Sequence, residues 1–137
     1  MPLSNDVNKS WDGWLVDDIG GQGEQYQNLL VGVVEKKSIP QCTIKVGTVN
    51  MWWRKDSRFI DVSSTLDGTI TTTIHIQDYG TGLWIGRAVE SYSASNYYKR
   101  MAAMAFIETI DRCIRDAILL LVEDSAIREV KDFGRGL

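Results

Sequence analysis

Histidine is the side chain most often used for acid–base chemistry near neutral pH, and this chain has one, His75. It stands between Thr73 and Gln77 on the polar side of a strand-like stretch. A histidine there can act as a general base if a carboxylate such as Asp61 or Glu90 lies across the sheet. Because the sequence fixes no such neighbour, we expect a half-exposed strand histidine and assign no catalytic residue.

The remaining patterns do not indicate a metal, phosphate or cofactor site. Cys42 and Cys113 are far apart in the chain and form no zinc-binding pattern with the single histidine. The aspartates before the glycine-rich loop at residues 20–23 lack calcium-loop spacing, and the loop itself has neither dinucleotide-binding spacing nor a P-loop lysine. We expect no metal and no cofactor. We interpret the cysteines as small apolar side chains, with a disulfide as the alternative.

The aromatic residues are more informative, because the chain contains five tryptophans in 137 residues. Trp52 and Trp53 are adjacent, so on a strand they point to opposite faces of the sheet. Only one of them can enter a core beneath a single layer of helices. The other needs a cover, either Trp11 and Trp14 of the N-terminal segment, a second subunit or an apolar ligand.

A ligand pocket built from these aromatic residues would lie between the helix and the sheet. Its apolar lining would come from side chains in the strands and at the start of the helix, and a histidine or a carboxylate would supply polar chemistry. The candidate binding residues are Trp52, Trp53, Trp84, Tyr98, His75 and Glu90.

Composition narrows the class of protein. The chain is 44% hydrophobic and 24% charged, as expected of one globular domain over residues 1–137. Its net charge of −3 argues against a nucleic-acid binder, and three cations beside the tryptophan pair, Arg54, Lys55 and Arg58, are too few to reverse that argument.

The distribution of apolar residues bears on location. No apolar run is long enough to span a membrane, and residues 1–10 lack the apolar core of a signal peptide. We therefore expect a cytoplasmic protein, or a periplasmic one if a leader has been removed.

Residues 41–92 predict strands joined by tight turns. Alternation is clearest over 69–77, where Ile70, Thr72, Ile74 and Ile76 share one face. In the segment 41–53, Gly47 suggests a bulge. Before these strands, the spacing of apolar residues from 11 to 19 suggests a short helix or anchored turn, and the valine-rich run 29–37 predicts a strand. We also expect a flexible arm at 1–10, a short helix at 125–131 and a tail at 132–137.

Residues 96–122 predict one long amphipathic helix, with N-cap candidates at 93–96. Glu108 and Arg112 are spaced to pair along its solvent face, as are Asp111 and Arg115. Such a helix is about 40 Å long at a rise of 1.5 Å per residue, whereas a strand of six residues spans only about 20 Å. One end should therefore overhang the sheet or meet a second subunit. Its expected apolar stripe consists of Ala103, Phe106, Ile107, Ile110, Ile114, Ala117, Ile118 and Leu121.

The region 69–122 resembles bacterial envelope lipoproteins of the curli-assembly and penicillin-binding-protein-activator type. Those proteins show an alternating strand, then D-x-x-T-G, L-W and G-R-A, and later a long helix rich in alanine and leucine. The resemblance implies a non-enzymatic assembly module. The matching positions are Asp78, Thr81, Gly82, Leu83, Trp84, Gly86, Arg87 and Ala88, with the helix at 96–122.

Together these patterns predict an α+β fold, in which an antiparallel, twisted meander of about five strands carries the long C-terminal helix across one face. Our first functional interpretation is a non-catalytic, homodimeric protein-interaction or assembly module that uses the overhanging helix and the surplus aromatic residues. The alternative is a binding protein or enzyme for a small apolar or aromatic molecule, with its pocket between helix and sheet.

Overall fold

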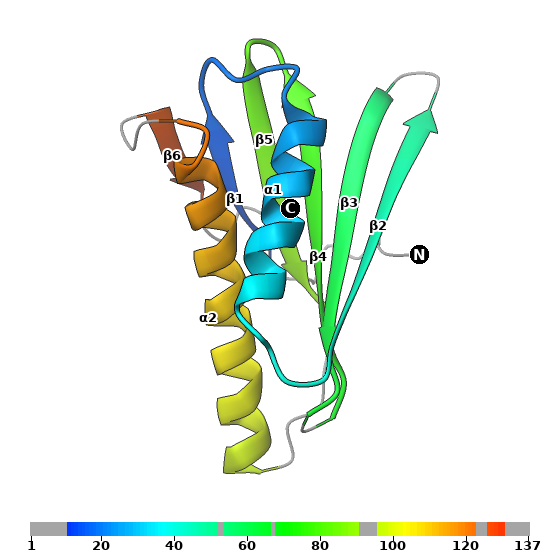
Figure 1. Cartoon of the computed structure of the whole chain (residues 1–137), viewed down its shortest axis with the longest axis vertical. Helices are drawn as coiled ribbons and strands as arrows, with labels where there is room; N and C mark the ends of the chain where they lie inside the picture. Colours follow the sequence, from blue (N-terminus) through cyan, green and yellow to red (C-terminus); the bar gives the residue numbers. More distant parts are fainter. Residues whose placement is uncertain (1–10, 52–53, 67, 91–95, 123–125, 131–137) are drawn as a thin grey trace.

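The computed structural model describes residues 11–51, 54–66, 68–90, 96–122 and 126–130. Over these residues the chain forms one open antiparallel sheet with both helices on the same face (Figure 1), which is an α+β fold. No helix in the described ranges is long and apolar enough to cross a membrane. The elements in chain order are β1 (Trp11–Val16), α1 (Gly23–Lys36), β2 (Cys42–Met51), β3 (Arg54–Ser64), β4 (Ile70–Tyr79), β5 (Gly82–Val89), α2 (Tyr97–Leu119) and β6 (Ile127–Val130).

The sheet order is β2-β3-β4-β5-β1-β6, so the predicted meander is confirmed and is extended by two strands from the chain ends. The expectation of a helix or turn over 11–19, and of a helix over 125–131, was wrong. β1 pairs along its whole length with β5 and also binds β6. The side chains of β1 alternate between the two faces of the sheet, as in any strand. Trp14 and Val16 enter the core, while Leu15 points to the opposite face.

The prediction of a strand over residues 29–37 was also wrong, because these residues form most of α1. Valine favours strands only weakly, and burial overrides that preference here. Tyr26, Leu30 and Val34 recur every four residues and are almost completely buried against the sheet and α2. The Tyr26 hydroxyl donates a hydrogen bond to the Ile114 carbonyl oxygen at 2.9 Å, which fastens α1 to α2.

The long helix is confirmed as α2. The side chain of Asn96 caps it by accepting a hydrogen bond from the Lys99 backbone N–H at 2.9 Å. The start of α2 reaches the same end of the molecule as the β3–β4 hairpin and extends slightly past it (Figure 1), so this end of the helix lies beside the end of the sheet. The buried stripe of α2 consists of Ala103, Phe106, Ile110, Cys113, Ile114, Ala117 and Ile118.

The two faces of the sheet differ in what lies on them. The helix-covered face carries Ile60, Ile74 and Ile85, which form the centre of the core. Trp14 also lies on this face, so the expectation that it covers the opposite face was wrong. Both cysteines are free, with Cys113 buried in the core. Burial raises the pKa of the Cys113 thiol to about 11, which keeps it protonated near neutral pH.

The glycine-rich loop at residues 20–23 packs against the β4–β5 turn. The Gly20 N–H donates to the Thr81 carbonyl oxygen at 2.8 Å, and the Gly21 N–H donates to an Asp78 carboxylate oxygen at 2.7 Å. A Cβ on Gly20 would lie 2.8 Å from the Gly80 carbonyl oxygen, so the close contact needs glycine. Gly47 causes no bulge, because the β2–β3 register shifts only between Val49 and Met51.

Candidate functional site

The residues that the sequence singles out lie in separate places. Trp84, His75 and Glu90 lie on or beside the helix-free face of the sheet, whereas Tyr98 is exposed in the first turn of α2. Trp52 and Trp53 fall outside the described residues. The four described candidates contribute nothing to the lining of the cavity that the structure shows between α2 and the sheet.

His75 contacts a serine on the neighbouring strand. Its Nε2 lies 2.6 Å from the Ser57 Oγ, and its ring lies against Phe59 with the ring centroids 6.1 Å apart. The residues directly across the sheet from it are Phe59 and Gly86, so neither cross-strand neighbour is a carboxylate. The Ser57 contact pairs two polar groups on a partly buried face, and we assign no reaction to it.

Asp61 lies two pairs along the same strands, on the same face, and accepts a hydrogen bond from the Thr73 hydroxyl at 2.8 Å. Burial raises the pKa of the Asp61 carboxyl, and the negative charge of Glu90 adds to that effect, while the Thr73 hydrogen bond opposes it. Among the residues that the structure describes, no group of three or more His, Cys, Asp or Glu side chains is placed to hold a metal ion.

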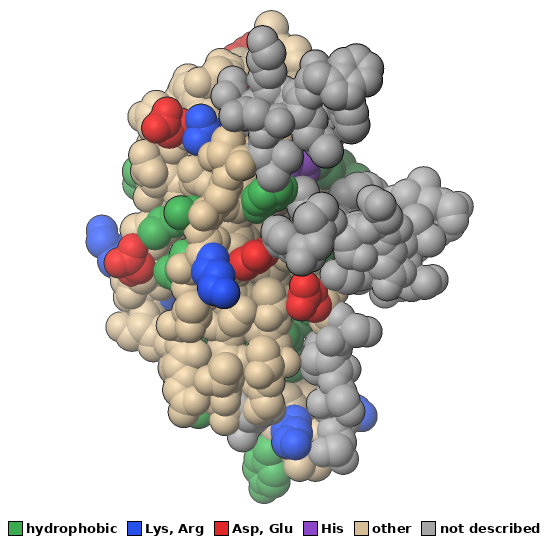
Figure 2. Space-filling view, turned by 90° about the vertical axis from the view of Figure 1, so that its right-hand side faces the viewer, with side chains coloured by type: hydrophobic (Ala, Val, Ile, Leu, Met, Phe, Trp, Pro, Cys, Tyr) green, Lys and Arg blue, Asp and Glu red, His purple; other side chains and the backbone are tan. Residues whose placement is uncertain are grey.

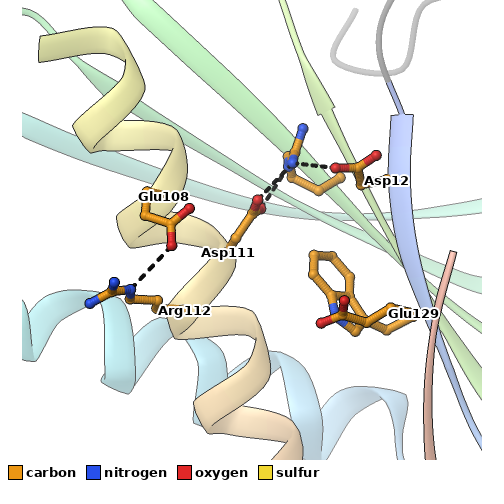
Figure 3. Close-up of polar contacts among 7 residues, drawn as sticks. Asp12, Glu108, Asp111, Arg112 and Glu129 are labelled. Carbon is orange, nitrogen blue, oxygen red and sulfur yellow. Dashed lines mark hydrogen bonds and ion pairs between the residues drawn. The ribbon is translucent and has the colours of Figure 1, made fainter. Parts of the chain in front are cut away.

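A buried ion cluster joins α2 to the sheet near β1. The Arg87 side chain is 5% exposed, and its guanidinium donates to both oxygens of Asp111 at 2.7 Å and to Asp12 at 2.9 Å. Figure 3 shows that Asp111 on α2 and Asp12 on β1 point toward the same side chain, to which dashed lines join both carboxylates. The predicted Asp111–Arg115 pair was wrong, since Arg115 instead pairs with Glu129 at 3.3 Å. Burial lowers the Arg87 pKa, but Asp111 and then Asp12 outweigh it, so the net pKa is raised.

A cavity of about 280 Å³ opens between the N-terminal half of α2, the end of the β3–β4 hairpin and the loop after α1. We call it the α2 groove. It exists because α2 has small side chains, such as Ala102, where it passes the hairpin, and because the loop turns away through positive φ at Ser38 and Gln41. Its lining consists of Lys37, Ile39, Pro40, Ser64, Leu66, Gly68, Thr69, Ile70, Lys99, Ala102, Ala103, Ala105, Phe106 and Thr109.

Two of the hydroxyl groups around the α2 groove bind the protein backbone. The Ser64 Oγ donates to the Pro40 carbonyl oxygen at 2.8 Å, and the Thr109 Oγ1 donates to the Ala105 carbonyl oxygen at 2.7 Å. The charged groups of the lining are Lys37 and Lys99, and no acidic residue is among the described residues that line it. Over its described lining, the α2 groove is therefore apolar and carries two lysines.

The solvent-facing side of α2 adjoins the groove at Ala105 and forms a second candidate surface, the α2 outer face. At the N-terminal end of α2, this face carries large apolar side chains that are exposed and do not pack in the core. Tyr98 is 69% exposed and Met104 is 62% exposed. The rings of Tyr97 and Tyr98 contact edge to face, with centroids 5.6 Å apart. In order along the helix, the α2 outer face consists of Tyr97, Tyr98, Arg100, Met101, Met104, Ala105, Glu108, Arg112, Arg115, Asp116, Leu119 and Leu120.

The middle of the α2 outer face is charged and its far end is apolar again. The predicted pair of Glu108 and Arg112 is confirmed at 3.3 Å (Figure 3). Leu119 and Leu120, which are 42% and 64% exposed, follow at the C-terminal end. Elsewhere, on the side that Figure 2 shows, acidic and basic side chains of the described residues are interspersed rather than gathered by sign.

Comparison with known proteins identifies no relative, since no family model, no curated protein and no solved structure matches this chain. The resemblance of residues 69–122 to envelope lipoproteins therefore stays a prediction. The functional argument rests on the two surfaces of α2, which pattern reasoning located only in part. The expected overhang concerned one end of the helix without saying which, and the α2 groove depends on a loop and a hairpin whose positions the sequence does not give.

Proposed function

We propose that this protein is a non-catalytic interaction module that forms a homodimer through the α2 outer face. The observation that carries the proposal is the order of side chains on that face, which has a mainly apolar first part interrupted by Arg100, a charged middle and an apolar end. Exposed Tyr97, Tyr98, Met101 and Met104 stand at one end, and exposed Leu119 and Leu120 stand at the other. Such large apolar residues clustered on one exposed face are typical of a protein interface.

Part of this pattern is complementary to itself when two copies of α2 lie antiparallel. A two-fold axis near Ile110 brings Met101 of one copy to Leu119 of the other, because these residues are equally far from the axis. The same axis brings Glu108 to Arg112 of the second copy, and the reverse. The same axis also brings Met104 to Asp116 and Arg100 to Leu120, so the complementary contacts are Met101 with Leu119 and Glu108 with Arg112, each made twice by the two-fold symmetry.

The length of the helix supports the same arrangement. α2 has 23 residues, which gives about 34 Å of helix for pairing at 1.5 Å per residue. Its inner stripe is fixed to α1 and the sheet, so pairing through the outer face needs no change in the fold. Arg115 and Asp116 already have partners in the same chain, Glu129 and Lys37. The charged centre would thus rely mainly on Glu108 and Arg112.

The test substitutes one residue in the apolar part of the α2 outer face. Met101→Glu places a charge opposite Leu119 of the second copy, and we expect it to weaken dimerisation at least tenfold in equilibrium sedimentation, since an unpaired charge in an apolar contact is strongly unfavourable. Gln25→Glu is the matched control, because it adds the same charge at an exposed position of α1. Equal dimerisation of both variants would contradict the proposal.

A further inference from the structure

The α2 groove borders the proposed dimer contact, since Ala105 belongs to both surfaces, and it has a chemistry of its own. Its walls are apolar, with Ile39 from the loop, Ile70 from the sheet and Phe106 from α2. Phe106 and Ile70 are buried in the core below, so this floor is held in place by the fold. A preformed apolar cavity with few polar groups is the usual form of a small-molecule site.

The charges around the α2 groove select the sign of a ligand. Lys99 and Lys37 are the charged residues of its lining, and the described residues that line it include no carboxylate. Lys37 pairs with Asp116 at 3.6 Å, but both side chains are about half exposed, so the pair is weak and leaves ammonium hydrogens for another acceptor. Lys99 starts in the capped first turn of α2, which fixes its backbone.

We propose that the α2 groove binds a small carboxylate with a compact apolar body. The apolar part lies between Phe106 and Ile39, and the carboxylate accepts hydrogen bonds from Lys99 and Lys37. The cavity volume of about 280 Å³ limits the size of the ligand. At about 30 Å³ per water-sized group it holds about nine non-hydrogen atoms, which suits a medium-chain fatty acid or a single-ring aromatic acid.

Isothermal titration calorimetry with octanoate, 3-phenylpropanoate, 1-octanol and octylamine tests the proposal. We expect both carboxylates to bind more tightly than the neutral alcohol, and the amine to bind most weakly. Tighter binding of octanoate assigns the site to alkyl acids, and tighter binding of phenylpropanoate assigns it to aromatic acids. Equal binding of octylamine and octanoate, or no binding of either carboxylate at millimolar concentration, would overturn the proposal.

Substitutions in the lining of the α2 groove test whether the ligand binds there. Lys99→Ala should lower the affinity for octanoate about tenfold and leave that for 1-octanol unchanged, because it removes only a charge-assisted contact. Ala102→Leu keeps a good helix former but fills the α2 groove, so it should abolish binding of both ligands. Lys45→Ala removes the same charge from an exposed position of β2 and should change neither affinity. Unchanged octanoate binding in Lys99→Ala would contradict the proposal.

The ligand site does not depend on the proposed dimer. Met101→Glu should therefore bind octanoate with the affinity of the unsubstituted protein, even as a monomer. Loss of dimerisation with retained binding would separate the two proposals, so that failure of one leaves the other standing.

Discussion

At the scale of single residues, Arg87 is the side chain on which the attachment of α2 depends most. It links Asp111 of α2 to Asp12 of β1 from a buried position. Arg87→Ala removes the positive charge that holds two carboxylates together, so we expect the free energy of unfolding to fall by about 3–5 kcal/mol. Urea unfolding followed by circular dichroism measures this loss.

Arg112→Ala is the control for Arg87, because Arg112 makes an ion pair with Glu108 in which both side chains are largely exposed. Its loss should change the free energy of unfolding by less than about 1 kcal/mol. Equal losses from the two substitutions would show that burial of the Arg87 cluster contributes nothing.

Asp61 gives a pH-dependent effect on the helix-free face. Since its pKa is raised in the folded state, mainly by burial, the folded protein holds this proton more tightly than the unfolded chain. The contribution of Asp61 to stability is therefore most favourable below its ordinary pKa and declines as pH rises through the raised value. Asn cannot ionise, and its side-chain oxygen can still accept the Thr73 hydrogen bond.

Asp61→Asn should consequently raise the melting temperature relative to the unsubstituted protein at about pH 7, and this gain should disappear at about pH 3. Thermal unfolding at the two pH values measures the difference. A gain of the same size at both would show that ionisation of Asp61 is not its cause.

The residue-scale chemistry could be predicted only where partners are close in sequence. The Glu108–Arg112 pair follows from helical spacing and is present. The same rule paired Asp111 with Arg115, but Asp111 binds Arg87, which lies on a strand that packs beneath the helix. Local spacing carries no information about which strand a helix crosses, and for that reason the buried cluster was missed.

At the scale of elements, the packing of β1 on β5 depends on a glycine. The Trp84 ring lies over Gly13, and a Cβ added there would be 2.2 Å from that ring. Gly13→Ala should therefore destabilise the protein by about 1–3 kcal/mol, because the tryptophan must move. Gly32 in α1 is the matched control, since a Cβ there has nothing within 4 Å. Gly32→Ala should stabilise by about 0.5–1 kcal/mol.

Chemical unfolding of both variants checks this prediction, and the double variant Gly13→Ala, Trp84→Leu adds a second test. A smaller side chain at residue 84 should recover part of the loss, because the two positions share one contact. Two glycine variants with the same change in stability would contradict the packing that we describe.

The elements predicted from sequence differ in how well their patterns distinguish them. The strands from β2 to β5 and the helix α2 have strong periodicity and short connections, and these were predicted. α1 was mistaken for a strand because its run of valines hides the four-residue spacing of Tyr26, Leu30 and Val34. β1 and β6 were missed because they are short and pair with strands distant in sequence.

At the scale of the whole molecule, α2 contributes to two adjoining surfaces of different chemistry. One flank lines the α2 groove, whose described lining is apolar with two lysines, and the solvent-facing side forms the α2 outer face, whose order of residues is complementary to itself in part. The existence of the long helix was predictable, but its overhang is slight (Figure 1), because β3 and β4 have 11 and 10 residues rather than the six assumed. The partly self-complementary order of its outer residues became apparent only when the structure showed which side of the helix is buried.

The most direct test of the proposed function is the mass of the unsubstituted protein in solution, measured by size-exclusion chromatography with light scattering over a range of concentrations. The chain has a mass of 15.4 kDa. We predict a species of twice that mass, which dissociates on dilution and is lost in Met101→Glu. A mass of one chain at the highest concentration would contradict the central claim that the α2 outer face is a dimer interface.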